Sequence, residues 1–135
     1  MGELTSPICD VETWLISFEK AVNDRDFEGA LSLYSDSVVL FGSRVAISKN
    51  MEDYSNRQWR HIWNSSQHFK ISEIVQLFEF DELKTCAVLW TNETEIDMVL
   101  RKRSGRATFI LHNGGRGLVA VHSHFSETPH DDHSR

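Results

Sequence analysis

The stretch 105–129, GRATFILHNGGRGLVAVHSHFSETP, decides how this chain folds. Two runs rich in Val, Ile, Leu and Phe flank residues 113–117, whose Asn and Gly tolerate the positive φ of a tight turn. This pattern predicts a β-hairpin, the last one of a sheet. Because strand side chains alternate between the two faces, each strand gathers its polar groups on one face. The polar groups of the two strands are Arg106 and Thr108, then His122, His124 and Ser126.

The length of the turn decides whether the two polar sets meet. A three-residue loop, 114–116, pairs Thr108 with His122 and Arg106 with His124 and brings both sets to one face. A two-residue loop, 114–115, separates the sets, because a slip of one residue turns every side chain of one strand to the opposite face. A type I turn followed by a glycine bulge favours the three-residue loop.

Length and composition limit the class of protein. A chain of 135 residues is expected to form one domain, here 1–129, followed by a flexible polar tail, 130–135. The two cysteines have no disulfide or zinc spacing, and we expect a reduced, cytoplasmic protein. No signal peptide or membrane segment is evident, which argues against a membrane partner. The net charge of −6 argues against nucleic acid as a partner.

The first half of the chain predicts three helices. The first begins after Ser6 and Pro7, an N-cap and first-turn proline, and carries one apolar stripe. Asp26 is predicted to cap a second, short helix. A third is expected from Met51 to Trp63, with Trp59 and Trp63 one turn apart. The apolar stripe of the first helix is Val11, Trp14, Leu15, Phe18 and Val22.

Strands make up most of the rest. The segment 38–41 predicts a short strand closed by Gly42, and 69–80 and 84–91 predict two longer strands joined by a turn at 81–82. The segment 92–103 alternates poorly and is interpreted as a partly extended connection. Helices followed by a run of mostly antiparallel strands predict an α+β domain, with three N-terminal helices packed on a curved sheet.

Two stretches resemble a known superfamily. Residues 34–42, YSDSVVLFG, resemble the junction between second helix and strand in the nuclear transport factor 2-like superfamily, which has a cystatin-like cone fold. Residues 105–108 and 121–129 resemble the SnoaL-like branch, and the pattern V-H-x-H-x-S-x-x-P is similar to the association (hub) domain of calcium/calmodulin-dependent protein kinase II. This resemblance implies the fold but not an activity, because the fold hosts enzymes, binding domains and assembly modules.

The resemblance also permits a test for one enzyme activity. Ketosteroid isomerases of this superfamily use an aspartate base, a tyrosine and a protonated aspartate. The corresponding positions here are Gly42, Phe18 and Thr108, which cannot supply that chemistry. Isomerase activity of this kind is therefore not expected, and any other enzyme activity stays uncertain.

A polar cavity is the expected site. If the hairpin pairs as predicted, four polar groups project into a cavity beneath the helices, where an arginine and aromatic walls suit a small organic anion. A structural network of neutral histidines, or Arg106 paired with Glu73 or Asp36, is an equally weighted alternative. No cofactor is implied, and a metal is not expected, because two histidines are too few ligands. The expected ligand-binding residues are Arg106, Thr108, His122, His124, Trp59, Trp63, Tyr34 and Trp90.

Two further functions remain open. The opposite face of the hairpin is apolar, which predicts a homodimer, and the hub resemblance extends this to a larger ring. The protein is then an assembly module without a ligand. The histidine pair also leaves an acid/base enzyme of the isomerase, hydratase or cyclase type possible. The face assigned to the partner subunit carries Ala107, Phe109, Leu111, Val119, Val121 and Phe125.

Overall fold

The computed structural model describes residues 8–42, 45–115 and 117–129. The first helix, α1 (Val11–Asp24), begins at Asp10, whose side chain accepts a hydrogen bond from the backbone N–H of Thr13 at 2.7 Å. Asp10 therefore takes the N-cap role predicted for Ser6, which lies outside the described residues. All five members of the predicted apolar stripe are buried, as expected for a helix that covers a sheet.

Two shorter helical segments follow. Asp26 caps α2 (Phe27–Leu31) by accepting from the backbone N–H of Gly29 at 2.9 Å, as predicted. The third predicted helix is continuous over residues 51–63 and consists of α3 (Met51–Tyr54), a π-helical segment η1 (Ser55–Trp59) and α4 (Arg60–Trp63). The wider turn of a π-helix brings Tyr54, Ser55, Gln58 and Trp59 to the buried side together.

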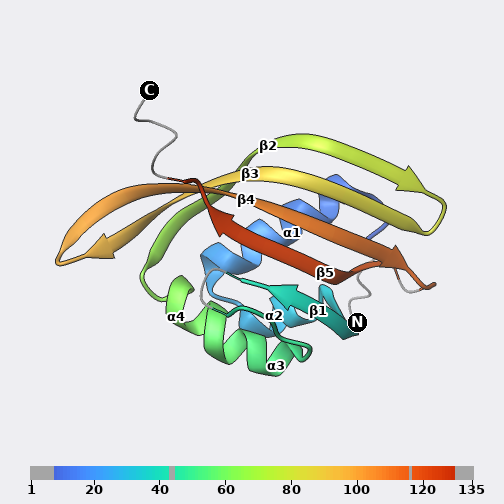
Figure 1. Cartoon of the computed structure of the whole chain (residues 1–135), viewed down its shortest axis with the longest axis horizontal. Coiled ribbons are helices and arrows are strands. Elements are labelled where there is room, and N and C mark those ends of the chain that lie inside the picture. Colours follow the sequence, from blue (N-terminus) through green and yellow to red (C-terminus); the bar gives the residue numbers. More distant parts are fainter. Residues whose placement is uncertain (1–7, 43–44, 116, 130–135) are drawn as a thin grey trace, which may run out of the picture.

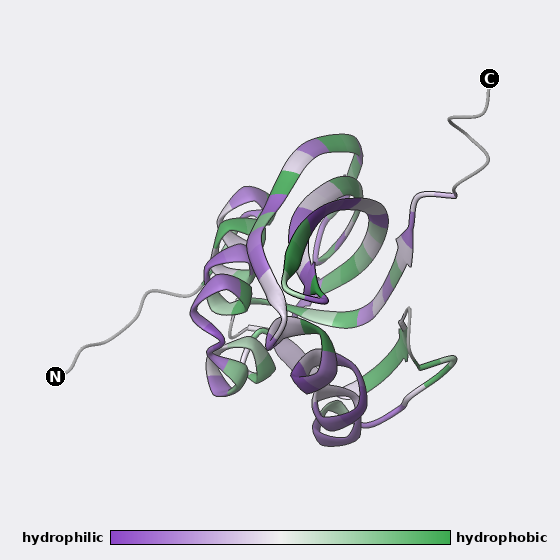
Figure 2. Ribbon diagram, turned by 90° about the vertical axis from the view of Figure 1, so that its left-hand side faces the viewer, coloured by the Kyte–Doolittle hydropathy of each residue, from purple (hydrophilic) through white to green (hydrophobic). Residues whose placement is uncertain are grey.

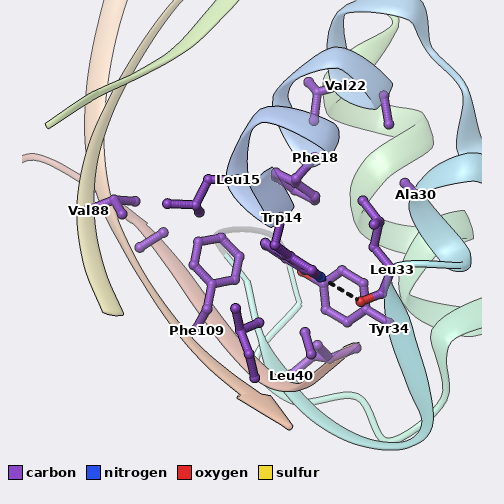
Figure 3. Close-up of a cluster of buried hydrophobic side chains, with 14 of the residues drawn as sticks. Trp14, Leu15, Phe18, Val22, Ala30, Leu33, Tyr34, Leu40, Val88 and Phe109 are labelled. Atoms are coloured by element: carbon purple, nitrogen blue, oxygen red, sulfur yellow. Dashed lines mark hydrogen bonds between the residues drawn. The ribbon is translucent and has the colours of Figure 1, made fainter. Parts of the chain in front are cut away.

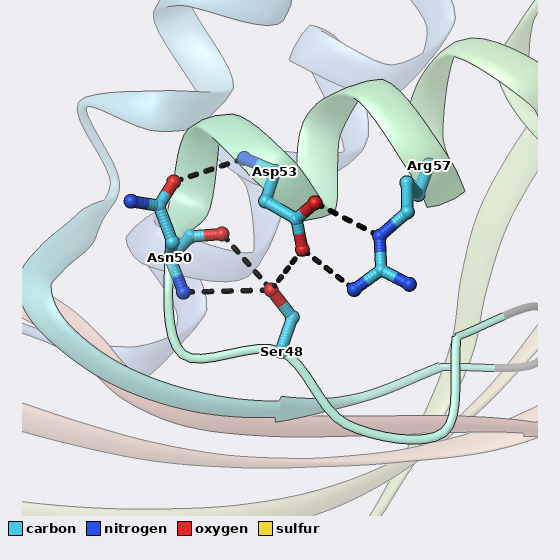
Figure 4. A network of polar contacts seen from close by, with 4 residues as sticks. All are labelled: Ser48, Asn50, Asp53 and Arg57. Carbon is cyan, nitrogen blue, oxygen red and sulfur yellow. Dashed lines mark hydrogen bonds and ion pairs between the residues drawn. The ribbon is translucent and has the colours of Figure 1, made fainter.

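A polar network fixes the start of α3. Asn50 caps the helix through its side chain, and Asp53 accepts two hydrogen bonds from Arg57, at 2.9 and 2.6 Å. The Ser48 hydroxyl donates to the same Asp53 carboxylate at 2.9 Å (Figure 4). These bonds lower the pKa of Asp53, the Arg57 bonds most strongly. The network ties the loop before the helix to the helix itself.

The five strands form one curved sheet in the order β1-β5-β4-β3-β2. Strand β1 (Tyr34–Phe41) runs parallel to β5 (Leu118–Glu127), and the other neighbours are antiparallel. The described helices pack on one side of this sheet, here called the inner face, and the opposite side is the outer face (Figures 1 and 2). The other three strands are the edge strand β2 (Ser66–Phe80), β3 (Leu83–Ile96) and β4 (Val99–Asn113).

Segment 92–103 is not the connection that the sequence suggested. Its two halves continue β3 and β4 as a long hairpin, turned by Asp97 and Met98, which both have positive φ. Alternation was hard to recognise because the inner positions here are polar, among them Asn92 and Arg103. The residues 81–82 form the predicted turn.

The core lies between α1 and the inner face. Trp14 is fully buried, stacks on Phe18 with ring centroids 5.6 Å apart, and donates its indole N–H to the carbonyl of Leu33 at 3.1 Å (Figure 3). Phe109 of β4 meets Trp14 edge-on at 4.9 Å. This aromatic cluster joins α1 to the middle of the sheet. No described helix is long and apolar enough to cross a membrane.

Candidate functional site

The final hairpin does not have the predicted register. Its strands pair Thr108 with His124 and Ile110 with His122, two residues away from the expected pairing. The loop between the paired Asn113 and Leu118 has four residues, and Val121 is an extra residue, a β-bulge, between Ala120 and His122. The bulge reverses the alternation within β5. The polar groups of the two strands therefore still share one face, as predicted, although both loop lengths considered were wrong.

That shared face is the outer one, so the predicted placement in the cavity is wrong. Arg106, Thr108 and His124 are exposed, and His122 is half-buried. The His122 Nδ1 lies 2.6 Å from the carbonyl oxygen of Val39, and the Arg106 guanidinium donates to the hydroxyl of Ser126 at 3.2 and 3.3 Å. Arg106 thus has neither of the carboxylate partners considered for it, Glu73 or Asp36, among its described contacts.

Four of the six residues assigned to a partner subunit, Ala107, Phe109, Leu111 and Phe125, lie on the inner face instead. Of the other two, Val119 pairs with His112 at an outer position, and Val121 is the bulge residue. Ala107, Phe109 and Leu111 are at most 2% exposed beneath the helices. Phe125 packs against them and contacts Phe109 with ring centroids 5.5 Å apart. Because the apolar side chains of β4 face the core, the polar side chains that alternate with them face solvent.

A pocket opens between helix 51–63 and the inner face. Its empty space is about 550 Å³ including the part open to solvent, of which about 50 Å³ is wide enough for the centre of a water molecule. That room suits a few waters or a slender group in this conformation. Trp59 and Trp63 stack in the wall with ring centroids 4.7 Å apart. The aromatic lining comprises Phe18, Tyr54, Trp59, Trp63, Phe69, Trp90 and Phe125.

Three of the four aromatic residues predicted for a ligand wall line this pocket: Trp59, Trp63 and Trp90. Tyr34 lies deeper in the core, where its hydroxyl is hydrogen-bonded to the Ser123 hydroxyl at 3.1 Å. Burial raises the pKa of Tyr34 far above its ordinary value, so this phenol is a neutral structural group.

Inward-facing polar side chains form a ladder across the sheet at the open side of the pocket. Asn92 of β3 donates to the Ser66 hydroxyl of β2 at 2.8 Å. Arg103 of β4 lies opposite Asn92 in the strand pairing and forms an ion pair with Glu127 of β5. All four residues line the pocket. The pocket is therefore aromatic inside and charged at its mouth.

Two buried polar atoms of the lining lack partners among the described residues: the Tyr54 hydroxyl and the Asn92 Oδ1. Tyr54 is 0% exposed and Asn92 is 6% exposed. A buried polar group without a hydrogen bond is costly, which makes both atoms candidates for contact with a bound molecule or water. Burial raises the pKa of Tyr54 far above its ordinary value, so its hydroxyl acts as a neutral donor.

The position matched from sequence to the isomerase base, Gly42, has two polar side chains close to where a side chain would begin. A Cβ atom at Gly42 would lie 2.6 Å from the Gln58 Oε1 and 2.7 Å from the Tyr54 hydroxyl. Phe18 lines the pocket without a polar group. Thr108, matched from sequence to the third isomerase position, faces outward and is not a pocket residue. The inward neighbours of Thr108 on β4, Ala107 and Phe109, are apolar, so no described residue of these positions supplies a carboxylic acid to the pocket.

Sequence reasoning missed the residues that give this pocket its polarity. The sequence of β4 contains a usable signal. Ala107, Phe109 and Leu111 show that odd-numbered residues face inward, and the same alternation toward the N-terminus places Arg103 on the inner face. No comparable signal marks Tyr54 or Gln58, because their inward position depends on the π-helical turn.

Helices packed into the concave face of one curved, mostly antiparallel sheet define the nuclear transport factor 2-like, or cystatin-like, class of fold, and solved structures confirm that this chain has it. It superposes with a TM-score of 0.75 on a nuclear transport factor 2-like superfamily protein from Salmonella enterica serovar Typhimurium, at 10% identity over 87% of each chain. A ketosteroid isomerase-like protein from Erwinia carotovora atroseptica gives a TM-score of 0.70 at 16% identity, covering 88% of this chain and 95% of that one.

A third similar structure matches the hub resemblance. The proposed calcium/calmodulin-dependent protein kinase type II association domain from Thiobacillus denitrificans gives a TM-score of 0.73 at 17% identity, covering 94% of this chain and all of that one. No protein-family model matches the sequence, and neither does any curated protein. At these identities the likeness concerns the fold, and a role has to be argued from the pocket and the surface.

Proposed function

We propose that this domain binds a small organic molecule in the pocket between helix 51–63 and the inner face of the sheet. The observation that carries the proposal is a pair of buried polar atoms among aromatic walls, the Tyr54 hydroxyl and the Asn92 Oδ1, which have no hydrogen-bond partner in the part of the chain that the structure describes. An apolar pocket with a few convergent polar groups is the usual form of a small-molecule site. His122 and His124 lie on the other side of the sheet from this pocket. A molecule bound in the pocket therefore does not reach an acid/base pair formed by these two histidines.

The pocket proposal is tested with two matched variants. We expect a fragment that raises the melting temperature of the wild-type protein to bind about tenfold more weakly to Asn92→Leu, because one buried hydrogen bond is worth about 1.4 kcal/mol. His124→Ala, on the outer face, should bind it like the wild type. Ligand-observed NMR measures all three affinities. A fragment whose affinity depends on His124 and not on Asn92 would move the site to the outer face.

A second candidate function is self-association through the outer face. The described helices all pack on the inner face, and the outer face keeps apolar side chains in solvent: Phe78 is 48% exposed and Phe80 65%, and the two rings stack 6.3 Å apart. Phe78 continues across the sheet through Thr85 and Ile110. A stacked pair of exposed aromatic rings on a sheet face favours a partner, and an identical subunit on a two-fold axis is the simplest one.

Sedimentation tests the second candidate. A homodimer has twice the chain mass of 15.6 kDa, and a hub-like ring has a mass several times larger. We expect Phe80→Lys to shift the protein toward monomer, because the substitution places a charge in the contact. Met98→Lys is the matched control, since Met98 is 90% exposed at the β3–β4 turn, away from that cluster. Even a weak dimer would form at about 100 µM protein. If the wild type is still a monomer at that concentration, self-association is refuted.

A further inference from the structure

We propose that the ligand of the pocket is an amphipathic organic carboxylate whose carboxylate replaces Glu127 on Arg103. This inference rests on the proposed pocket function and names the chemical class of the ligand. Glu127 then serves as an internal substitute for the ligand: it keeps Arg103 paired while the pocket is empty and leaves when a better-placed carboxylate arrives.

Arg103 has the position that such a ligand requires. It projects from β4 beside Asn92 on the inner face and lines the mouth of the aromatic pocket. Its side chain is 31% exposed, so the guanidinium has lost much of its water. This desolvation lowers the pKa of Arg103 from its ordinary value. A partly desolvated guanidinium favours a carboxylate partner, which it binds through two parallel hydrogen bonds.

Glu127 can leave without disturbing the sheet. Its side chain is 40% exposed, and ion pairs this exposed contribute little net stability. The backbone beside it is held independently, since the N–H of Thr128 donates to the Ser104 carbonyl at 3.0 Å and the two hydroxyls of these residues bond to each other at 3.0 Å. A side-chain rotation of Glu127 therefore suffices to open Arg103 to a ligand.

The surface outside the mouth favours anions over cations. Arg103 and Glu127 also line a second, open hollow of about 1160 Å³ including solvent space, on the side away from the aromatic walls. Arg101 and Lys102 line it as well, so its described lining residues include three cationic groups and one acidic group. Although the chain carries a net charge of −6, this entrance is locally basic and suits a ligand whose apolar part enters first and whose carboxylate remains at the mouth.

The test compares acids with amides of the same shape. The probes are butyrate, hexanoate and phenylacetate, whose apolar parts are slender enough for the pocket, each with its primary amide, titrated by ligand-observed NMR. In the wild-type protein we expect an acid to bind more tightly than its amide. Glu127→Gln should raise affinity for the acid severalfold and leave the amide within twofold, because Arg103 is then unpaired. Arg103→Gln should weaken the acid about tenfold, again with little change for the amide.

The outcomes separate this inference from the proposed function. If acids and amides both bind and Glu127→Gln does not favour the acids, the pocket function stands and the exchange of carboxylates is wrong. If no acid or amide binds the wild type at 10 mM, a concentration that detects even very weak complexes, the pocket function itself fails. Circular dichroism of each variant confirms that it is folded, and both substitutions concern partly exposed side chains whose loss is compatible with folding.

Discussion

Gly105→Ala should destabilise the protein although it adds only one methyl group. Gly105 is the buried residue of β4 against which Trp90 lies, and its backbone does not need positive φ. A Cβ atom at Gly105 would overlap the six-membered ring of Trp90 and the backbone carbonyl oxygen of Ser126. The tryptophan ring can move only by giving up its place in the pocket wall, and the carbonyl belongs to the β5 ladder.

The magnitude follows from the cost of overpacking. Extra atoms in a filled core cost about 1–3 kcal/mol, and about 3–5 °C of melting temperature is lost per kcal/mol in a domain of this size. We therefore expect Gly105→Ala to lower the melting temperature by roughly 3–15 °C, measured by calorimetry. Gly114→Ala is the matched control, because a Cβ there would meet nothing closer than 3.5 Å.

A double-mutant cycle identifies the cause. In a Trp90→Phe background the smaller ring removes part of the overlap, so Gly105→Ala should cost less there than in the wild type. The remaining cost reports the contact with the Ser126 carbonyl. If Gly105→Ala is as stable as Gly114→Ala, or costs the same in both backgrounds, Trp90 does not press against β4 as described, and the pocket wall is misplaced.

Two other predictions concern ionisable groups. The wild type should melt at a higher temperature than Asp53→Asn, with the full difference at pH 6 and a smaller one as pH falls below about 4. The hydrogen bonds from Arg57 lower the pKa of Asp53 in the folded protein. The stabilisation from this carboxylate is therefore present above the pKa of Asp53 in the unfolded chain and is lost as pH falls through its pKa in the folded protein. Burial raises the pKa of the Cys86 thiol to about 11, so iodoacetamide at pH 8 should modify the exposed Cys9 and leave Cys86 intact in the native protein; two adducts by mass spectrometry would contradict this burial.

Local patterns were sufficient to predict most of the fold. The stripe of α1 and the cap of α2 are decided by neighbouring residues, and the helix 51–63 has the predicted bounds. The α+β class and the curved, mostly antiparallel sheet follow from the order of such elements. These features depend on interactions within a few residues, which a single sequence records directly.

The inside of the final hairpin was harder to predict because one residue interrupts its alternation. Leu118 and Ala120 face the core before the bulge at Val121, and Ser123 and Phe125 face it afterwards. The bulge leaves no trace in the composition of the sequence, because Val121 is as apolar as Val119 and Ala120 before it. The parity of β5 is therefore decided by pairing with β4, a contact between strands that the local pattern does not contain.

The pocket shows the same dependence on pairing, and this explains its composition. The inward-facing residues of β3 and β4 are apolar where the strands lie beneath the helices, as at Val88 and Phe109. Where the β3–β4 hairpin extends beyond the helices, its inward-facing residues are polar, as at Asn92 and Arg103. The change occurs at the pocket mouth, where the inner positions range from buried, as at Asn92, to partly exposed, as at Arg103. Residues that face inward but are reached by water are the ones able to exchange a protein partner for a ligand, and Arg103 is the cationic member of that set.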